Sequence, residues 1–397
     1  MVSLEEARRR ISRAVFREPS VVYLRPWEAM GMIAADHVRA LRDVPEVRVS
    51  AMDGYAVRSK DLERYRMLKV VGKLFPGDAP GEVGEGEAFY VSTGAPIPRG
   101  ADAVVRLEAT RVVGGYIAPV EDVWSGKDIV EVGDVVRRGD IIVRRGEIIS
   151  PYAVGLMIRS GVGEVPIYRI RIGLIAVGDE LSRFDMEEPG IKDHISPIII
   201  GLASFAEKEY LGVVRDDVNE ISRILRHALS KTDIVITLGG TSVGEKDLVK
   251  KAVSQVGELL FEGVDVNVIK RGSVAISDGK PIIILPGQCV SSVACYHEHG
   301  LHVISRMVGN ELRVFEKAVL GSEIDARHKM HSLYLFKLEG GKAYPLRWGP
   351  GQCLELLRAD AMGVIRRDQR YRVGDEITLQ RLIKIAQPIT TYIDQGY

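Results

Sequence analysis

Continuous apolar runs in the second half of the chain alternate with amphipathic segments. The apolar runs cover residues 172–177, 211–214, 234–238 and 282–285. Runs of this kind are typical of strands that are covered on both faces. Between and after them, helices are expected from Ser196, over 218–229, from Glu245 and from Val290. Strands and helices that alternate in this way predict a doubly wound, mainly parallel α/β sheet domain, from about residue 169 to 311.

The rest of the chain carries different patterns. Ser3 and Glu6 form a capping box, and a helical face follows at Leu4, Ala7, Ile11 and Val15. A second short helix is expected from Pro26. Residues 44–139 consist of short Val/Ile-rich runs broken by Gly-Asp and Pro-Gly pairs, which predicts β structure with tight turns. The tail, 312–397, repeats such short runs and is predicted to be a small β domain.

Composition restricts the class of protein. The 397 residues include 54 Lys plus Arg and 54 Asp plus Glu, so the net charge is zero. Nucleic-acid partners, which need concentrated positive charge, are therefore not expected. The longest apolar stretch, 195–206, is too short and too interrupted to span a bilayer. The N-terminus has no apolar signal core, and the three cysteines form no C-x-x-C pair. A cytoplasmic protein without membrane partners is expected.

A glycine-rich loop directly follows the apolar run 234–238. It reads Gly239-Gly240-Thr241-Ser242-Val243-Gly244. Glycines let successive backbone N–H groups approach a ligand, and a strand end that leads into a helix favours an anion. The loop is not a P-loop, because Glu245 separates the last glycine from Lys246 and Asp247 stands where Ser or Thr would bind magnesium. The alternative is an ordinary glycine-rich turn.

Two further segments lie at predicted strand ends. Asp179-Glu180 is either a turn with a helix cap or a functional carboxylate pair. The segment 285–292 can hold an anion, and its Cys289 is either a low-pKa thiol or, more simply, an inert packed residue. Two clusters are discounted. His297, His299 and His302 lack the spacing of a zinc motif and are expected to be surface or core histidines. The arginines 8–10 and 366–367 are expected to be solvated faces.

Two segments of the β-rich region complete a recognisable pattern. They are Ser-Ala-Met-Asp-Gly-Tyr-Ala at 50–56 and Ser-Thr-Gly-Ala-Pro-Ile-Pro-Arg-Gly-Ala-Asp-Ala-Val-Val at 92–105. Together with Gly-Asp-Glu-Leu at 178–181 and the glycine loop, they resemble the molybdopterin molybdenumtransferase family, the MoeA proteins, to which the E domain of gephyrin belongs. The resemblance implies an elongated subunit of four parts that forms a homodimer. These parts are 1–43 with 140–168 (helical and extended), 44–139 (inserted β-rich), 169–311 (α/β, molybdopterin-binding) and 312–397 (C-terminal β).

The resemblance also implies an activity in molybdenum cofactor biosynthesis. Members of the family insert molybdate, or tungstate, into adenylylated molybdopterin and release AMP, with a divalent cation such as Mg²⁺. The implied catalytic residues are Asp53, Thr93, Asp134, Glu180, Asp216 and Asp247. Metal would be held by Glu180 and Asp247, since Mg²⁺ prefers oxygen ligands. The implied molybdopterin-binding residues are Gly239, Gly240, Thr241, Ser242, Gly244, Lys270, Pro286 and Gly287. The inserted position of Asp53 implies a site shared between domains or subunits.

By their positions, Lys246, Lys270 and Arg271 are candidate donors to the oxyanion. Three segments depart from the family pattern. Gln288-Cys289 replaces Asn-Pro, Ser273 replaces the second lysine of Lys-Pro-Gly-Lys-Pro, and Ile195 replaces the Asn of Asp-x-Asn. These departures motivate an alternative, a non-catalytic or regulatory paralogue that binds molybdopterin or a protein partner. Adenylylation of molybdopterin is a third hypothesis, against which the inserted β-rich part argues.

Overall fold

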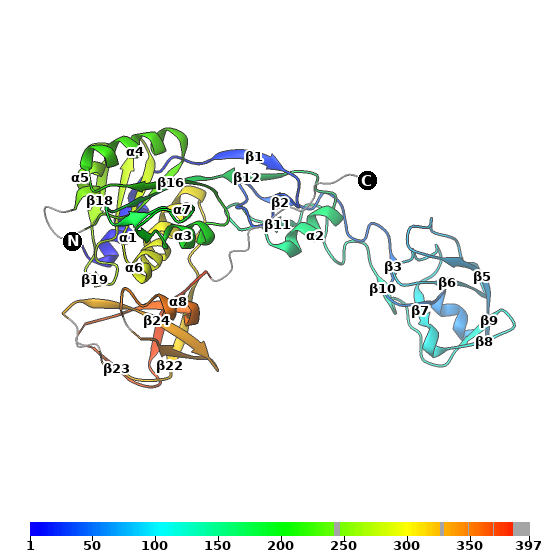
Figure 1. Cartoon of the computed structure of the whole chain (residues 1–397). Coiled ribbons are helices and arrows are strands. Elements are labelled where there is room, and N and C mark those ends of the chain that lie inside the picture. Colours follow the sequence, from blue (N-terminus) through cyan, green and yellow to red (C-terminus); the bar gives the residue numbers. More distant parts are fainter. Residues whose placement is uncertain (242–246, 326–328, 348, 368, 384–397) are drawn as a thin grey trace. The chain divides into compact units, whose positions relative to one another are not determined.

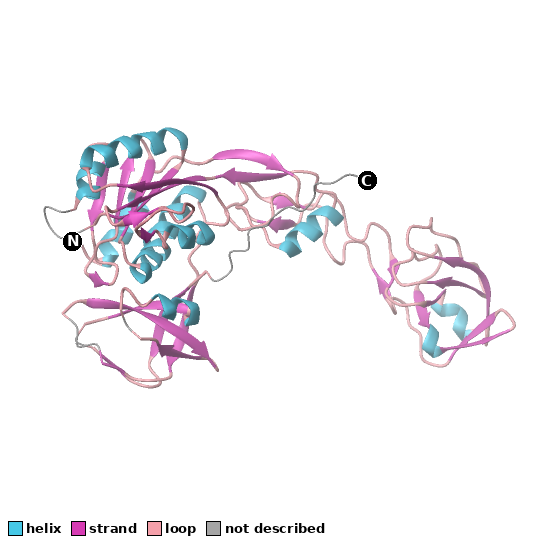
Figure 2. Ribbon diagram, in the orientation of Figure 1, coloured by secondary structure: helices cyan, strands magenta, loops and turns pink. Residues whose placement is uncertain are grey.

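The computed structural model describes residues 1–241, 247–325, 329–347, 349–367 and 369–383. The chain divides into two compact units. Unit 1 comprises Met1–His37, Val143–Pro151 and Glu164–Tyr397, and unit 2 comprises Val38–Ile142 and Tyr152–Gly163. Figures 1 and 2 show the elements of each. The finer division into four parts stays a prediction.

Unit 1 is built on a six-stranded sheet with the order β16-β13-β17-β21-β20-β18 (Figure 1). Its strands are β16 (Glu207–Val214), β13 (Arg171–Val177), β17 (Ile234–Gly239), β21 (Lys280–Leu285), β20 (Ser273–Ser277) and β18 (Glu258–Glu262). The first four are mutually parallel, β20 pairs antiparallel with β21, and β18 pairs antiparallel with β20. The prediction of a mainly parallel sheet is therefore confirmed, and two further strands, β20 and β18, extend it beyond β21 through antiparallel pairings.

Helices cover both faces of this sheet, as Figure 2 shows. One face carries α4 (Val218–Lys231) and α5 (Leu248–Ser254), whose apolar residues pack with Ile175 and Val177 of β13. The other face packs Ile172 and Leu174 against a second group of helices. This group comprises α1 (Leu4–Arg13), α3 (Ser196–Leu202), α6 (Cys289–Cys295), the π-helical turn η4 (Tyr296–Gly300) and α7 (Leu301–Val308). The side chains of β13 are buried on both faces of the sheet, which explains its uninterrupted hydrophobic run.

The N-terminal expectations are partly confirmed. The Ser3 hydroxyl accepts a hydrogen bond from the Glu6 N–H at 3.1 Å and so caps α1. The helix ends at Arg13, so Val15 lies beyond it and is exposed, against the prediction. The helix predicted from Pro26 is also wrong, because the chain there forms only turns. β1 (Ser20–Leu24) precedes these turns and pairs antiparallel with β12 (Val165–Arg169).

A second six-stranded sheet forms the C-terminal part of unit 1 and confirms its predicted β character. Its order is β19-β24-β25-β22-β28-β26. The strands are β19 (Val266–Asn267), β24 (His331–Glu339), β25 (Lys342–Pro345), β22 (Phe315–Leu320), β28 (Glu376–Arg381) and β26 (Ala361–Ile365). The short helix α8 (Cys353–Arg358) packs against both β24 and α6. The remaining short strands of unit 1 are β14 (Leu181–Ser182) with β15 (Ile191–Lys192), and β23 (Ile324–Asp325) with β27 (Arg370–Tyr371).

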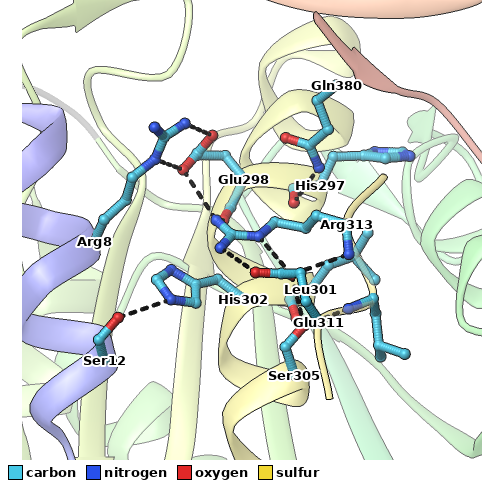
Figure 3. Close-up of polar contacts among 11 residues, drawn as sticks. Arg8, Ser12, His297, Glu298, Leu301, His302, Ser305, Glu311, Arg313 and Gln380 are labelled. Carbon is cyan, nitrogen blue, oxygen red and sulfur yellow. Dashed lines mark hydrogen bonds and ion pairs between the residues drawn. The ribbon is translucent and has the colours of Figure 1, made fainter. Parts of the chain in front are cut away.

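A buried ion-pair network joins α1, η4 and the start of the C-terminal sheet (Figure 3). Arg8 donates to both carboxylate oxygens of Glu298, at 2.6 and 2.7 Å, and Arg313 approaches the same carboxylate at 3.5 Å. Burial raises the pKa of Glu298, but the hydrogen bonds and charge of Arg8 outweigh it, so the pKa lies below its usual value. The prediction that Arg8 belongs to a solvated face is wrong, because its guanidinium compensates a carboxylate that is 98% buried (2% exposed).

The three discounted histidines are core residues. His297 accepts from the Ile383 N–H at 3.0 Å through Nε2, and its Nδ1 lies 2.8 Å from the Val293 carbonyl. His302 Nε2 contacts the Ser12 hydroxyl at 3.1 Å. His299 packs edge-on against Phe261. Burial lowers the pKa of each of the three histidines to about 4.

Unit 1 is expected to lose stability as the pH falls from about 6.5 to 4. The folded-state histidine pKa of about 4 lies below the ordinary value of 6.5, so the neutral form is favoured on folding and the stabilisation is present above pH 6.5. Full protonation of one such histidine costs roughly 3 kcal/mol. Urea unfolding at pH 7, 5.5 and 4 measures the loss. His299→Leu should reduce this pH dependence, whereas His227→Leu, at an exposed position on α4, should not. An equal slope in both variants would contradict the assignment.

Unit 2 is built on a third six-stranded sheet, with the order β7-β4-β6-β5-β9-β8. The strands are β7 (Ala103–Arg106), β4 (Gly54–Val57), β6 (Glu87–Val91), β5 (Leu68–Leu74), β9 (Tyr116–Pro119) and β8 (Thr110–Val113). Short pairs join β3 (Val49–Ser50) with β10 (Ile129–Val130), and β2 (Val38–Arg39) with β11 (Ile141–Val143). Two 3₁₀ turns (Ser59–Glu63, Leu107–Ala109) and α2 (Pro151–Arg159) complete it. In the ranges that the structure describes, no helix is long and apolar enough to cross a membrane.

Candidate functional site

A cavity of about 390 Å³ lies in unit 1 at the carboxyl ends of β13, β17 and β21. Ligands of open α/β sheets bind at this edge, where strand ends meet helix N-termini. The walls come from all three predicted strand-end segments and from three further segments, at 193–195, at 267–271 and at Pro350. Among the lining residues are Val177, Glu180, His194, Gly239, Gly240, Thr241, Asn267, Lys270, Arg271, Pro286, Gly287, Gln288, Ser291 and Pro350.

The first wall is the turn that ends β17. Gly239 and Gly240 both have left-handed backbone, with φ of +86° and +62°. A Cβ atom on Gly239 would lie 2.5 Å from the Val177 carbonyl oxygen, and one on Gly240 would lie 2.5 Å from a Val249 methyl group. Only glycine therefore fits at either position, and the backbone itself borders the cavity. The predicted ligand-binding residues Ser242 and Gly244, and the donor candidate Lys246, lie outside the described residues.

The second wall carries positive charge. Lys270 and Arg271 both line the cavity, and Arg271 Nη1 donates to the Thr241 carbonyl at 3.1 Å, which ties this wall to the glycine turn. Asn267 and Val268, which also line the cavity, were not identified from the sequence. Val268 has φ of +74°, and Asn267 Oδ1 accepts the Val268 N–H at 3.0 Å. A β-branched residue in this conformation is strained, and such strain gathers at functional sites. Sequence carries no signal for it, because valine ordinarily indicates a strand.

Carboxylates form the third wall. Glu180 lines the cavity. A Cβ on Gly178 would lie 2.9 Å from the Glu180 carboxylate, so the glycine leaves space for this carboxylate. Asp193 is buried and accepts the N–H groups of Ile195 and Ser196, at 3.2 and 3.1 Å, and the Tyr210 hydroxyl at 3.0 Å. Asp193 thus holds the start of α3. Burial, followed by the charge of Asp193, raises the pKa of Tyr210. His194, the residue after Asp193, also lines the cavity.

Asp216 and Asp247 do not line this cavity. Asp247 caps α5, where Oδ1 accepts the Lys250 N–H at 3.3 Å and Oδ2 pairs with Lys250 Nζ at 2.8 Å. Asp216 follows β16 and donates its N–H to Asp179 Oδ1 at 3.1 Å. Burial, and then the neighbouring acids, raise the pKa of Asp216. The roles predicted for both aspartates stay predictions.

The fourth wall runs from β21 into α6. The Ser292 hydroxyl hydrogen-bonds to the Pro286 carbonyl and fixes the turn that presents Gly287 and Gln288. Cys289 is a buried thiol whose environment disfavours the thiolate. It is 3% exposed, and burial with hydrogen bonding to the Cys353 thiol raises its pKa to about 12. The low-pKa thiol is therefore excluded, and the packed residue is correct.

The remaining predicted residues belong to unit 2. Asp53 Oδ1 accepts both the N–H and the hydroxyl of Thr93, at 2.6 and 3.1 Å, so these two residues are brought together. Asp134 accepts the Glu131 N–H at 2.8 Å and stabilises a tight turn in which Gly133 has φ of +75°. Asp53 and Thr93 are exposed, as is Asp134.

Comparison with known proteins decides the family. Residues 2–161 match the MoeA N-terminal region (domain I and II), and residues 173–306 match a family described as probable molybdopterin binding domain. A molybdopterin molybdenumtransferase of Haemophilus influenzae is 30% identical over 328 residues, covering 78% of this chain and 79% of that protein. The chain belongs to the MoeA family. A putative molybdopterin biosynthesis protein of Methanocaldococcus jannaschii is 31% identical over 280 residues, 67% of this chain and 69% of that one.

Solved structures agree with this placement in the MoeA family. A molybdopterin biosynthesis moeA protein from Pyrococcus horikoshii matches with a TM-score of 0.78 and 27% identity, over 96% of this chain and all of that one. The predicted fold class, an α/β domain flanked by β-rich parts, is confirmed. Within the described ranges, no three His, Cys, Asp or Glu side chains gather into a group that could hold a metal ion.

Proposed function

We propose that this MoeA-family protein inserts molybdate, or tungstate, into adenylylated molybdopterin and releases AMP. The observation that carries the proposal is the cavity at the end of β17, where two glycines expose their backbone beside Lys270 and Arg271. Backbone N–H groups and fixed cations together bind anions of the size of phosphate or molybdate. The printed name of the Haemophilus influenzae relative, a molybdopterin molybdenumtransferase, supports the same activity.

Each wall has a separate task in this proposal. The turn of Gly239 and Gly240, with the Thr241 N–H, binds an anionic part of molybdopterin. Lys270 and Arg271, which both line the cavity, hold the oxyanion and offset its charge. Pro286 and Gly287 leave room for the pterin, and the Gln288 amide can replace the asparagine that the family pattern has there. His194 adds a further donor at the third wall.

Of the two carboxylates expected to bind magnesium, only that of Glu180 is available in the cavity. Glu180 offers a free carboxylate to the cavity, whereas both oxygens of Asp247 are engaged by Lys250. Because Mg²⁺ keeps several waters and is often bound through one or two carboxylates and substrate phosphates, Glu180 would hold it together with the phosphates of the substrate. Bound there, the ion would neutralise charge that develops on the phosphate. Asp247 would join it only after releasing Lys250.

Further elements of the proposal concern unit 2 and the assembly. Asp53 and Thr93 are proposed to act in the reaction as a hydrogen-bonded pair, with Asp134 and Asp216 as additional acids. The protein is proposed to be cytoplasmic, in keeping with its odd number of cysteines, three. It is also proposed to be a homodimer, in keeping with the MoeA family. Sedimentation velocity at micromolar concentration tests the assembly, and a monomer would contradict it.

The experiment that tests the activity measures AMP release. Purified protein given adenylylated molybdopterin, molybdate and Mg²⁺ should release one AMP for each molybdate inserted, and tungstate should be compared in parallel. No AMP release with either oxyanion would contradict the proposal and favour a non-catalytic paralogue. If the protein is inactive, Gln288→Asn tests whether the departure from the family pattern at Gln288, in the cavity wall, is the cause. Ser273→Lys cannot test the departure at Ser273 in the same way, because Ser273 is fully buried and its hydroxyl accepts the Gly263 N–H at 3.1 Å.

A further inference from the structure

One tyrosine contacts both sides of the loop that forms the third wall of the cavity. The loop covers residues 180–195 and contains the paired short strands β14 and β15. On the edge strand β16, the ring of Tyr210 packs against Phe184, with centroids 4.6 Å apart, and the Arg183 guanidinium lies over it at 5.0 Å. The Tyr210 hydroxyl donates to Asp193 Oδ2 at 3.0 Å. The ring thus anchors the β14 side of the loop, and the hydroxyl anchors the β15 side.

The backbone of β16 leaves space for this contact. The register of β16 with β13 shifts directly after Tyr210, where β16 carries one extra residue. Gly212, at this bulge, has φ of +93°, and a Cβ there would lie 2.6 Å from Arg183 Nη1. A larger residue at this position would be strained and would displace Arg183 from the tyrosine ring.

The tyrosine hydroxyl acts on His194 through a carboxylate. Asp193 Oδ1 accepts the N–H groups of Ile195 and Ser196, at 3.2 and 3.1 Å, while Oδ2 accepts the tyrosine hydroxyl. These bonds bracket the backbone of His194 between contacts of one side chain. Because Asp193 is only 3% exposed, water does not readily replace its partners. The orientation of His194 therefore depends on a carboxylate that the tyrosine holds in place.

His194 is the residue of the segment 193–195 whose side chain can meet a ligand. Asp193 is engaged, and Ile195, which stands where the family pattern has asparagine, is 5% exposed and belongs to the apolar core. His194 is exposed and lines the cavity. Its Nδ1 lies 3.3 Å from the Lys192 carbonyl, which can only accept, so Nδ1 carries the hydrogen and a ligand would meet Nε2. An imidazole protonated at Nε2 offers an anion a hydrogen bond and a positive charge.

We propose that Tyr210 is a positioning residue for the oxyanion site: through Asp193 it holds His194 in the orientation in which Nε2 donates to the oxyanion. The inference rests on the proposed function, because it adds a third donor to the oxyanion that Lys270 and Arg271 hold. Tyr210 itself does not line the cavity, so its effect on the ligand must pass through the loop that it anchors. No covalent bond forms or breaks in this role.

A double-mutant cycle in the full chain tests this role, with molybdate as the probe. Isothermal titration at about pH 6.5, where an ordinary imidazole is half protonated, measures the dissociation constant. Tyr210→Phe keeps the ring and removes the hydroxyl, and it should weaken molybdate binding about fivefold. In the background of His194→Ala, the same substitution should change the affinity by less than about twofold, because the group through which Tyr210 acts is then absent. A role in stability alone would weaken binding equally in both backgrounds.

The control is Tyr23→Phe, which removes a hydroxyl from an exposed position on β1 of the same unit and should leave molybdate affinity unchanged. Equal losses from Tyr210→Phe in both backgrounds, no loss in either, or no binding of molybdate by the unmodified protein would each overturn the inference. AMP release is measured separately. Equal losses in a protein that releases AMP would overturn the positioning role alone, whereas the predicted cycle in a protein that releases none would overturn the proposed activity alone.

Discussion

Replacing Glu298 with alanine is expected to lower the free energy of unfolding by about 3–5 kcal/mol, the largest stability effect of any single substitution proposed for this chain. The reason is that Arg8 would keep its charge while losing the buried carboxylate that both of its donors bind, whereas Arg313 keeps a second partner, Glu311, at 2.7 Å. An uncompensated charge in a poorly solvated position is far more costly than a lost surface contact. Urea unfolding followed by circular dichroism measures the change.

A matched control is available for Glu298. Glu376 forms an ion pair of nearly the same length with Lys317, at 2.7 Å, but both side chains are more than half exposed. Glu376→Ala should therefore leave the urea midpoint almost unchanged. Equal effects of the two substitutions would contradict a stabilising role for the contacts around Glu298 that Figure 3 shows.

Replacing Lys270 with methionine is expected to reduce AMP release by about 10²–10³-fold. Methionine keeps much of the length of the side chain but removes the positive charge from the cavity wall. If Lys270 stabilises charge in the transition state, the loss should appear in kcat as well as in KM. A rise in KM with kcat unchanged would instead show that Lys270 contributes only uniform binding.

The control for Lys270 is Lys231→Met, at the exposed end of α4. It removes the same charge from the same unit without touching the cavity, so turnover should stay within about twofold of the unmodified protein. Loss of activity in both variants would point to net charge, and activity retained in Lys270→Met would contradict the assigned oxyanion wall.

The sheet of unit 1 was predictable because its signal is local. Buried parallel strands such as β13 and β17 are continuous apolar runs, and α4 repeats apolar residues at helical spacing. The strands β18 and β20 were not predicted, since their runs are partly exposed and mixed with polar residues. The turn after Pro26 was predicted as a helix, because a proline and an acidic residue indicate a helix start even where nothing continues it.

The cavity was only partly predictable, because its walls meet through tertiary structure. The glycine turn, Glu180 and Lys270 follow from strand ends and from the family pattern. Pro350 lies more than 100 residues beyond Gly240, and its place in the wall depends on how α8 packs on α6. The ion pair between Arg8 and Glu298 joins positions 290 residues apart. No periodicity of charge along the chain could distinguish this arginine from its solvated neighbours.

Equilibrium binding of molybdopterin to a variant with a narrowed cavity tests the central claim most directly. A Cβ on Gly287 would lie 3.3 Å from Gly239 Cα, so Gly287→Val places its methyl groups in the cavity with only a small shift of the backbone. Gly155→Val adds the same atoms to α2, where the added Cβ would meet nothing within 4 Å beyond its chain neighbours and the backbone of the helix itself. We predict that the unmodified protein and Gly155→Val bind molybdopterin alike, and that Gly287→Val binds at least about tenfold more weakly. Equal binding by Gly287→Val would contradict the placement of molybdopterin in this cavity.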